Sequence, residues 1–135
     1  MILPRIILPW TKMSDLSQNS RLHWSKQRRL KKAQKHAADG LARAAGWHLI
    51  DIPDDAEIVA TLTYCPPPGT VYPDDDNVVA AHKSARDALA AVLRINDSRF
   101  RSHAVPGGRC KLGAVIIDAR ATGSSWKSIG VEAVE

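Results

Sequence analysis

Cysteine is scarce in this sequence: among 135 residues, only Cys65 and Cys110 carry a thiol. Neither belongs to a CxxC pair, and their spacing matches no metal-binding motif. The five histidines are scattered and form no HxH, HxxxH or HExxH pattern, which argues against a zinc site. We therefore expect two reduced structural thiols, in a chain long enough to bury a core without disulfides.

Long apolar runs are also missing. The N-terminal stretch MILPRIILPW is interrupted by proline and arginine, so we expect no membrane-spanning segment, and it lacks the features of a signal peptide. No repeat, low-complexity tract or long linker divides the chain. With 44% hydrophobic and 24% charged residues, the sequence predicts one soluble, cytoplasmic domain over residues 1–135.

Three segments have the composition of β-strands. Residues 57–65, EIVATLTYC, alternate two sets of side chains and are rich in β-branched residues. The prolines that follow end this strand, because proline cannot donate to a sheet hydrogen bond. Residues 5–10 and 111–120 are expected to form the other two strands, and residues 106–108, PGG, form a turn.

Two segments have helical periodicity. Residues 21–45 repeat apolar side chains every three or four positions before the stop signal Gly46, and the predicted buried stripe is Leu30, Ala33, Ala37, Leu41 and Ala44. The second helix, residues 78–94, is expected to bury Val78, Ala85, Leu89 and Val92. This order of elements predicts an α/β (α+β) domain in which two main helices pack on a mixed β-sheet.

The charges are unevenly distributed in a chain whose formal net charge is +5. The first predicted helix carries many basic residues against a single acid, Asp39. Such a run either binds phosphates or is a solvated amphipathic face. The candidate DNA-binding residues are Arg21, Lys26, Arg28, Arg29, Lys31, Lys32 and Lys35. We expect Trp24 and Trp47 to be core or helix-anchoring aromatics, with Trp24 the better exception for base stacking.

Acidic residues gather before the second helix. Asp74 and Asp76 project to the same side if the backbone there is extended, and Asp76 or Asn77 would cap the helix. On one continuous helix, Lys83 would share a face with Asp76 and Asp87. Asp97 follows the helix. These carboxylates could hold Mg²⁺, with Lys83 stabilising charge on a phosphate; the alternative is an exposed capping turn and a surface Lys83–Asp87 pair.

The stretch PDDDNVVAAHKSARDALAAVLRINDSRF, residues 73–100, resembles the signature of the RusA-type Holliday-junction resolvases. NSRLHWSKQRRLKKAQ and YCPPPG, which precede it, also resemble segments of that family. The resemblance implies a small homodimeric endonuclease that uses Mg²⁺, or Mn²⁺ as a substitute, to resolve four-way DNA junctions by paired nicks in recombination and repair. It assigns the metal ligands to Asp74, Asp76 and Asp97, and the essential lysine to Lys83.

Two departures from that signature leave alternatives open. The family's usual pair of acids is here Asn96–Asp97, which predicts weaker metal affinity or a non-catalytic nucleic-acid-binding accessory protein. The helix is about one turn longer than in the shortest members, so Lys83 is preferred to Ala80 as the essential lysine. A phosphatase acting on small phosphoesters is a third class, which the long basic run disfavours.

Overall fold

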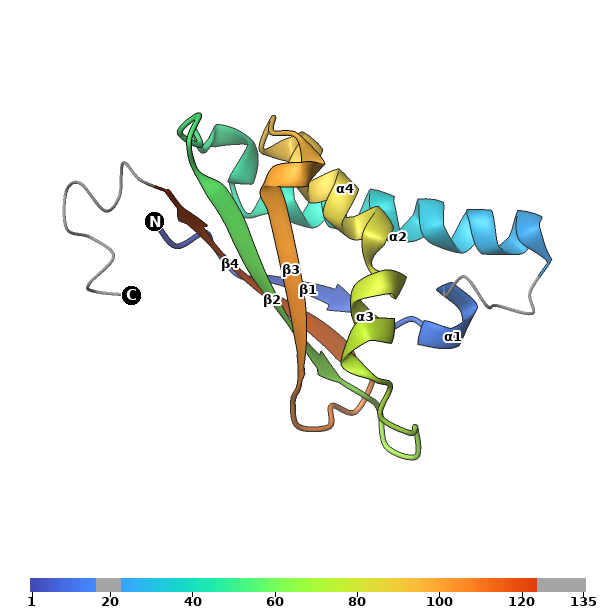
Figure 1. Cartoon of the computed structure of the whole chain (residues 1–135). Helices are drawn as coiled ribbons and strands as arrows, with labels where there is room; N and C mark the ends of the chain where they lie inside the picture. The colour runs from blue at the N-terminus through green and yellow to red at the C-terminus, as the bar shows by residue number, and fades with distance from the viewer. Residues whose placement is uncertain (17–22, 124–135) are drawn as a thin grey trace.

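The computed structural model describes residues 1–16 and 23–123, and its centre is a four-stranded mixed sheet (Figure 1). The strand order is β1-β4-β2-β3, with β1 at Ile6–Pro9, β2 at Glu57–Cys65, β3 at Phe100–Pro106 and β4 at Ala114–Thr122. β4 is antiparallel to both β1 and β2, whereas β3 is parallel to β2. The predicted α+β fold class is confirmed.

The helices lie on one side of this sheet (Figure 1). They are α1 at Met13–Leu16, α2 at Trp24–Ala44, α3 at Asp75–Ala81 and α4 at Lys83–Val92, with short 3-10 turns η1 at Trp47–Leu49 and η2 at Asp97–Arg99. Within the described residues, every helix is too short or too polar to cross a membrane.

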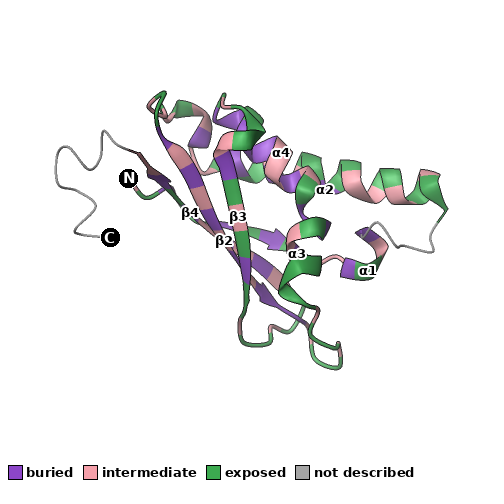
Figure 2. Ribbon diagram, in the orientation of Figure 1, coloured by how far each residue is buried: buried purple, intermediate pink, exposed green. Residues whose placement is uncertain are grey.

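The core lies between the sheet and these helices. On β2 the burial alternates as predicted from Glu57 to Tyr64, with every second side chain buried and the others half-buried, and Cys65 at the end is also buried (Figure 2). Leu62 of β2 and Ile6 of β1 both pair with Ile117 of β4, so the buried side chains of three strands meet in one row. Helices therefore cover one face of the sheet, while the opposite face remains partly exposed.

The strand β3 is absent from the sequence prediction, which placed only a connection between the second helix and the turn at 106–108. Only Phe100 and Ala104 of this strand are buried, so its sequence lacks a clear alternation. β3 is held instead by parallel pairing with β2 and by an ion pair of 2.5 Å between Arg101 and Glu57. Pairing with a distant partner, which local sequence does not encode, determines this strand.

The helix α2 begins and ends close to its predicted limits, and Gly46 follows it in the left-handed conformation with φ 86°. The predicted buried stripe is only partly right, because Leu30 and Ala37 pack half-buried against the core but the other three residues do not. Ala33, Leu41 and Ala44 are exposed, and the fully buried residues are Gln34, Ala38 and Ala42. The small side chains Ala38 and Ala42 allow α2 to pack closely on α4, and the polar Gln34 belongs to the buried stripe.

The predicted single helix at 78–94 is two helices. α3 starts earlier, at Asp75, with Asp74 rather than Asp76 or Asn77 as the N-cap. The helix then breaks at His82, whose backbone has φ −104° and ψ 18°, and α4 starts at Lys83. The four apolar residues of the predicted stripe are nonetheless all buried, as expected. Lys83 and Asp76 therefore do not lie on one continuous helix, and the shared face expected from ideal geometry is wrong.

Candidate functional site

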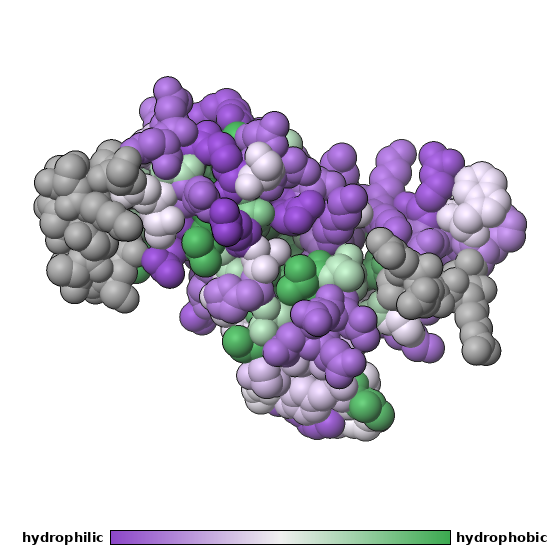
Figure 3. Space-filling model, in the orientation of Figure 1, coloured by the Kyte–Doolittle hydropathy of each residue, from purple (hydrophilic) through white to green (hydrophobic). Residues whose placement is uncertain are grey.

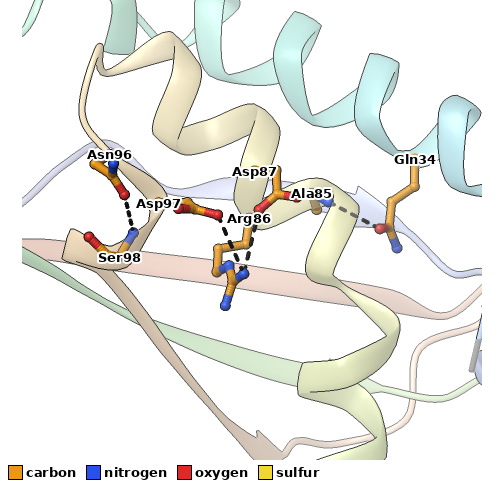
Figure 4. A network of polar contacts seen from close by, with 7 residues as sticks. All are labelled: Gln34, Ala85, Arg86, Asp87, Asn96, Asp97 and Ser98. Atoms are coloured by element: carbon orange, nitrogen blue, oxygen red, sulfur yellow. Dashed lines mark hydrogen bonds and ion pairs between the residues drawn. The ribbon is translucent and has the colours of Figure 1, made fainter. Parts of the chain in front are cut away.

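Gln34 of α2 explains the break between α3 and α4. Its side-chain nitrogen donates to the Ala81 carbonyl at 3.1 Å, and its side-chain oxygen accepts from the Ala85 N–H at 3.1 Å. In an unbroken helix, Ala85 N–H would donate directly to Ala81 O. The buried amide of Gln34 is inserted between these two groups and satisfies both; Figure 4 shows its contact with Ala85. The basic helix α2 is therefore joined directly to the start of α4.

The acidic residues Asp74, Asp75 and Asp76 are exposed at the start of α3. Asp74 has an extended backbone, with φ −73° and ψ 149°, and its carbonyl accepts from the Val78 N–H at 3.0 Å. Carboxylates in the first turn of a helix interact favourably with the helix dipole. The start of α3 therefore provides a structural reason for acidic residues at this position, as the capping alternative predicted.

The middle carboxylate of this segment is anchored to the sheet. The hydroxyl of Tyr64, a buried residue of β2, donates to Asp75. Burial, followed by this hydrogen bond and the charge of Asp75, raises the pKa of Tyr64 to about 12. Among the described residues, no hydrogen bond or ion pair engages the side chains of Asp74 and Asp76. Anchoring Asp75 thus leaves its two neighbours available to solvent and ligands.

The third predicted metal ligand, Asp97, lies beside a cation. A terminal nitrogen of Arg86 is 3.9 Å from Asp97 Oδ2 and 3.5 Å from Asp87 Oδ1 (Figure 4). The Nε of Arg86 is buried and has no hydrogen-bond partner within the described structure. Arg86 therefore balances two carboxylates, and the surface Lys83–Asp87 pair considered from the sequence is replaced by Arg86–Asp87.

Asn96, which stands in place of the family's first acid, has a structural role. Its side-chain oxygen accepts from the Ser98 N–H at 2.9 Å and caps η2 (Figure 4). This contact fixes the start of the turn that carries Asp97. The amide oxygen that could have served as a weak metal ligand is already engaged.

The predicted ligands are not assembled into one group in this structure. Over residues 1–16 and 23–123, no three His, Cys, Asp or Glu side chains are arranged to hold a metal ion. Asp74 and Asp76 lie at the start of α3, whereas Asp97 lies beside Arg86 near α4. The donor chemistry suits a hard cation, because all three are exposed carboxylates. The metal site stays a prediction.

Lys83 is the first residue of α4 and is exposed. In the part of the chain that the structure describes, no carboxylate pairs with its ammonium group. The break at His82 places Lys83 between Ala81 and Ala85, the two residues whose backbone groups Gln34 bridges. Within the described structure, the ammonium group of Lys83 is thus unpaired and lies close to where Gln34 of α2 contacts the ends of α3 and α4.

The N-terminal half of α2 forms a basic face, which we define as Lys26, Arg28, Arg29, Lys31, Lys32 and Lys35. All are exposed except Lys31, which is half-buried, and none pairs with a carboxylate among the described residues. The only acid of α2, Asp39, pairs instead with Arg43 at 3.0 Å. Figure 3 shows hydrophilic side chains gathered over this helix. Arg21 lies outside the described residues.

The two tryptophans of this region differ. Trp47 is fully buried and its Nε1 donates to the Pro4 carbonyl at 2.9 Å, so its prediction as a core residue is confirmed. Trp24, the first residue of α2, is 62% exposed. Of the alternatives considered for Trp24, a core position is wrong, because the start of α2 projects beyond the sheet (Figure 1).

Two further groups were not expected from the sequence. The thiols of Cys65 and Cys110 are neighbours, and burial followed by a hydrogen bond with Cys110 raises the pKa of Cys65. His82 is buried, with Nδ1 at 2.8 Å from the Val78 carbonyl, and burial lowers its pKa. The Cys65–Cys110 contact and the burial of His82 both depend on tertiary packing, which the spacing along the sequence does not indicate.

Comparison with known proteins adds one relative. No protein-family model matches this chain. An uncharacterized protein of Xylella fastidiosa is 38% identical over 98 residues, which cover 73% of this chain and 63% of that protein. The chain thus spans less than two thirds of this relative's length, and the relative carries no assigned activity.

Proposed function

We propose that this protein is a Mg²⁺-dependent endonuclease that acts on branched DNA and resolves four-way junctions by paired nicks. The observation that carries the proposal is the Gln34 bridge, which joins the basic face of α2 to the α3–α4 break beside Lys83. A surface that attracts a phosphate backbone is thereby connected to the helix that begins with the acidic segment. The resemblance of residues 73–100 to the RusA-type resolvases supports the same function.

Asp74, Asp76 and Asp97 would hold the metal ion. Mg²⁺, when bound, would supply a Lewis acid and lower the pKa of a coordinated water. To bind the ion, Asp97 must give up its contact with Arg86. That contact is long, at 3.9 Å, and the Asp97 side chain is 53% exposed, so losing it costs little free energy. Exposed ion pairs of this kind contribute only about 0–1 kcal/mol. The pair with Arg86 is therefore compatible with a metal-binding role.

The remaining steps belong to the basic residues. The ammonium group of Lys83 can move to a phosphate oxygen without breaking an ion pair in the described structure, and would stabilise negative charge that develops there. The basic face of α2 would bind the DNA backbone and give affinity that falls with salt. Paired nicks on opposing strands need two sites, which a homodimer would supply. A DNA substrate also implies a cytoplasmic protein.

Incubation of a synthetic four-way junction with the protein tests this function. With Mg²⁺ we expect symmetric nicks near the branch point, strongly reduced in Asp76→Asn. Asp54→Asn removes another exposed carboxylate, outside the acidic segment, and is the matched control that should cleave like wild type. Absence of nicks with both Mg²⁺ and Mn²⁺, or full cleavage by Asp76→Asn, would contradict the proposal.

A second candidate is a non-catalytic protein that binds branched nucleic acid. The observation that favours it is that these groups already have protein partners, because Asn96 caps η2 and Arg86 lies beside Asp87 and Asp97. This candidate predicts junction binding that survives EDTA, with no cleavage under Mg²⁺ or Mn²⁺. Gel-shift and nicking assays on one junction distinguish the two functions.

A further inference from the structure

Trp24 is an exposed aromatic ring within a basic surface. It is the first residue of α2, and 62% of its area is exposed, whereas Trp47 is fully buried. An open groove of about 530 Å³ runs along this part of the helix, and its lining is Trp24, Ser25, Arg28, Arg29, Lys31 and Lys32. A large aromatic face left in water, at the edge of a groove with four cations, is suited to a ligand that is both flat and anionic.

The ring of Trp24 already interacts with neighbouring side chains. The guanidinium carbon of Arg28 lies 5.5 Å from the ring centroid, within the range of a cation–π contact. The ring of His23 is 5.6 Å away with an interplanar angle of 33°. His23 also caps α2, with Nδ1 accepting from the Ser25 N–H at 3.2 Å. The tryptophan at the tip of the helix therefore has a cation and a second ring beside it.

We propose that Trp24 is a stacking platform for an unpaired nucleobase, and that Arg28, Arg29 and Lys32 hold the phosphates that flank this base. Stacking needs a free base face, which a continuous duplex does not offer and a branch point or single strand does. The groove's charge selects a polyanion over an apolar or cationic peptide, and no acid lines it. The inference deepens the proposed function, because it names the feature of branched DNA that α2 recognises.

Binding measured in EDTA tests this platform without cleavage. A fluorescein-labelled thymidine oligonucleotide and a fully paired duplex of the same length are titrated with protein, and anisotropy gives the two Kd values. Trp24→Ala should weaken single-strand binding by roughly 5- to 100-fold and leave duplex binding within about twofold. Trp24→Phe keeps an aromatic face and should recover most of the affinity, whereas Trp24→Leu keeps apolar bulk and should not.

Lys32→Ala is the matched control within the same groove. It removes a phosphate contact, so it should weaken binding to both oligonucleotides. If Trp24→Ala leaves single-strand affinity unchanged, weakens both ligands equally, or is fully rescued by leucine, the stacking platform is wrong. Wild-type protein that binds neither oligonucleotide would overturn the platform too. If single-strand binding depends on Trp24 as expected but the protein makes no Mg²⁺-dependent nicks, the platform is supported and only the endonuclease is contradicted.

Discussion

The basic face of α2 and the acidic residues around α3 and α4 have different kinds of surroundings. The basic side chains have no acidic partner among the described residues, and they extend from a helix that projects beyond the sheet (Figure 1). Most of the acids are tied to the fold: Asp75 accepts from Tyr64, and Asp87 and Asp97 share Arg86. Asp74 and Asp76 alone among the predicted ligands keep carboxylates without a hydrogen bond or ion pair in the described structure.

This difference indicates a division of roles. Unpaired charges on one helix suit loose, salt-dependent contact with a long polyanion, because each contact is weak and many are possible. Among the acids, anchoring of Asp75 by Tyr64 fixes the start of α3, and its neighbours Asp74 and Asp76 keep carboxylates that can take a cation. Gln34 connects the two regions, and the following experiments test that connection and the contrast on either side of it.

The largest effect on folding is expected from Gln34→Leu. The substitution removes the partners of the Ala81 carbonyl and the Ala85 N–H, both buried. Leaving a buried polar group unpaired costs about 1–3 kcal/mol, so the free energy of unfolding should fall by about 2–6 kcal/mol in urea titrations. His36→Leu, at an exposed position of α2, should change it by less than about 0.5 kcal/mol. Equal effects of the two variants would show that the helix break closes without Gln34.

Lys83→Ala should lower the rate of junction cleavage by roughly 10²–10³-fold, the usual cost of removing a group that stabilises transition-state charge. Lys83 is exposed, so the free energy of unfolding should hardly change. The exposed Lys111, in the connection between β3 and β4, supplies the control Lys111→Ala with near-normal cleavage. Single-turnover nicking assays measure both rates. A cleavage rate that falls equally in both variants would assign Lys83 only to general DNA attraction.

The unpaired state of the basic face predicts its salt dependence. Each phosphate contact that is removed should reduce the slope of log K against log salt by about 0.7–0.9. Arg29→Ala and Lys32→Ala should each produce this change in anisotropy titrations across a salt series. Arg43→Ala should leave the slope unchanged, because Arg43 is paired with Asp39. The basic face would lose its assigned role if Arg43→Ala altered the slope as much as Arg29→Ala.

The smallest expected effect concerns acid stability. Burial lowers the pKa of His82 from 6.5, so the unfolded chain binds more protons than the folded one between pH 6.5 and the folded pKa. The stability contributed by neutral His82 is present above pH 6.5 and is lost as the pH falls, by at most about 1.4 kcal/mol per pH unit. Urea titrations at several pH values should show a shallower acid loss in His82→Asn than in wild type. Parallel curves would contradict the pKa shift.

The sequence predicted the parts of the fold whose periodicity is strong and local. The alternation in β2 and the apolar stripe at Val78, Ala85, Leu89 and Val92 both follow from pattern alone, and both are confirmed. The strand β3 escaped prediction because its stability comes from pairing with β2. The buried stripe of α2 was only partly predicted for a similar reason, since a polar residue takes part in it.

The candidate site shows the same limit. Asp74, Asp76, Lys83 and Asp97 could be named from residue types and order, but their partners could not. The break at His82 is bridged by Gln34, 48 positions away in the chain, and Asp75 is anchored by a tyrosine on another element. Arg86 lies beside two of the acids, but no sequence pattern indicates that role. Interactions between distant segments set the charge balance of the site, and the local spacing of residues cannot predict them.

Titration of the metal-free protein with Mn²⁺, followed by electron paramagnetic resonance, tests the central claim most directly. The account predicts saturable binding that Mg²⁺ displaces and that weakens in Asp74→Asn, in Asp76→Asn and in Asp97→Asn, but not in Asp54→Asn. If the Mn²⁺ affinity of Asp97→Asn or of Asp76→Asn equals that of the wild type, these three carboxylates do not share one ion. That result would contradict the metal-dependent nuclease.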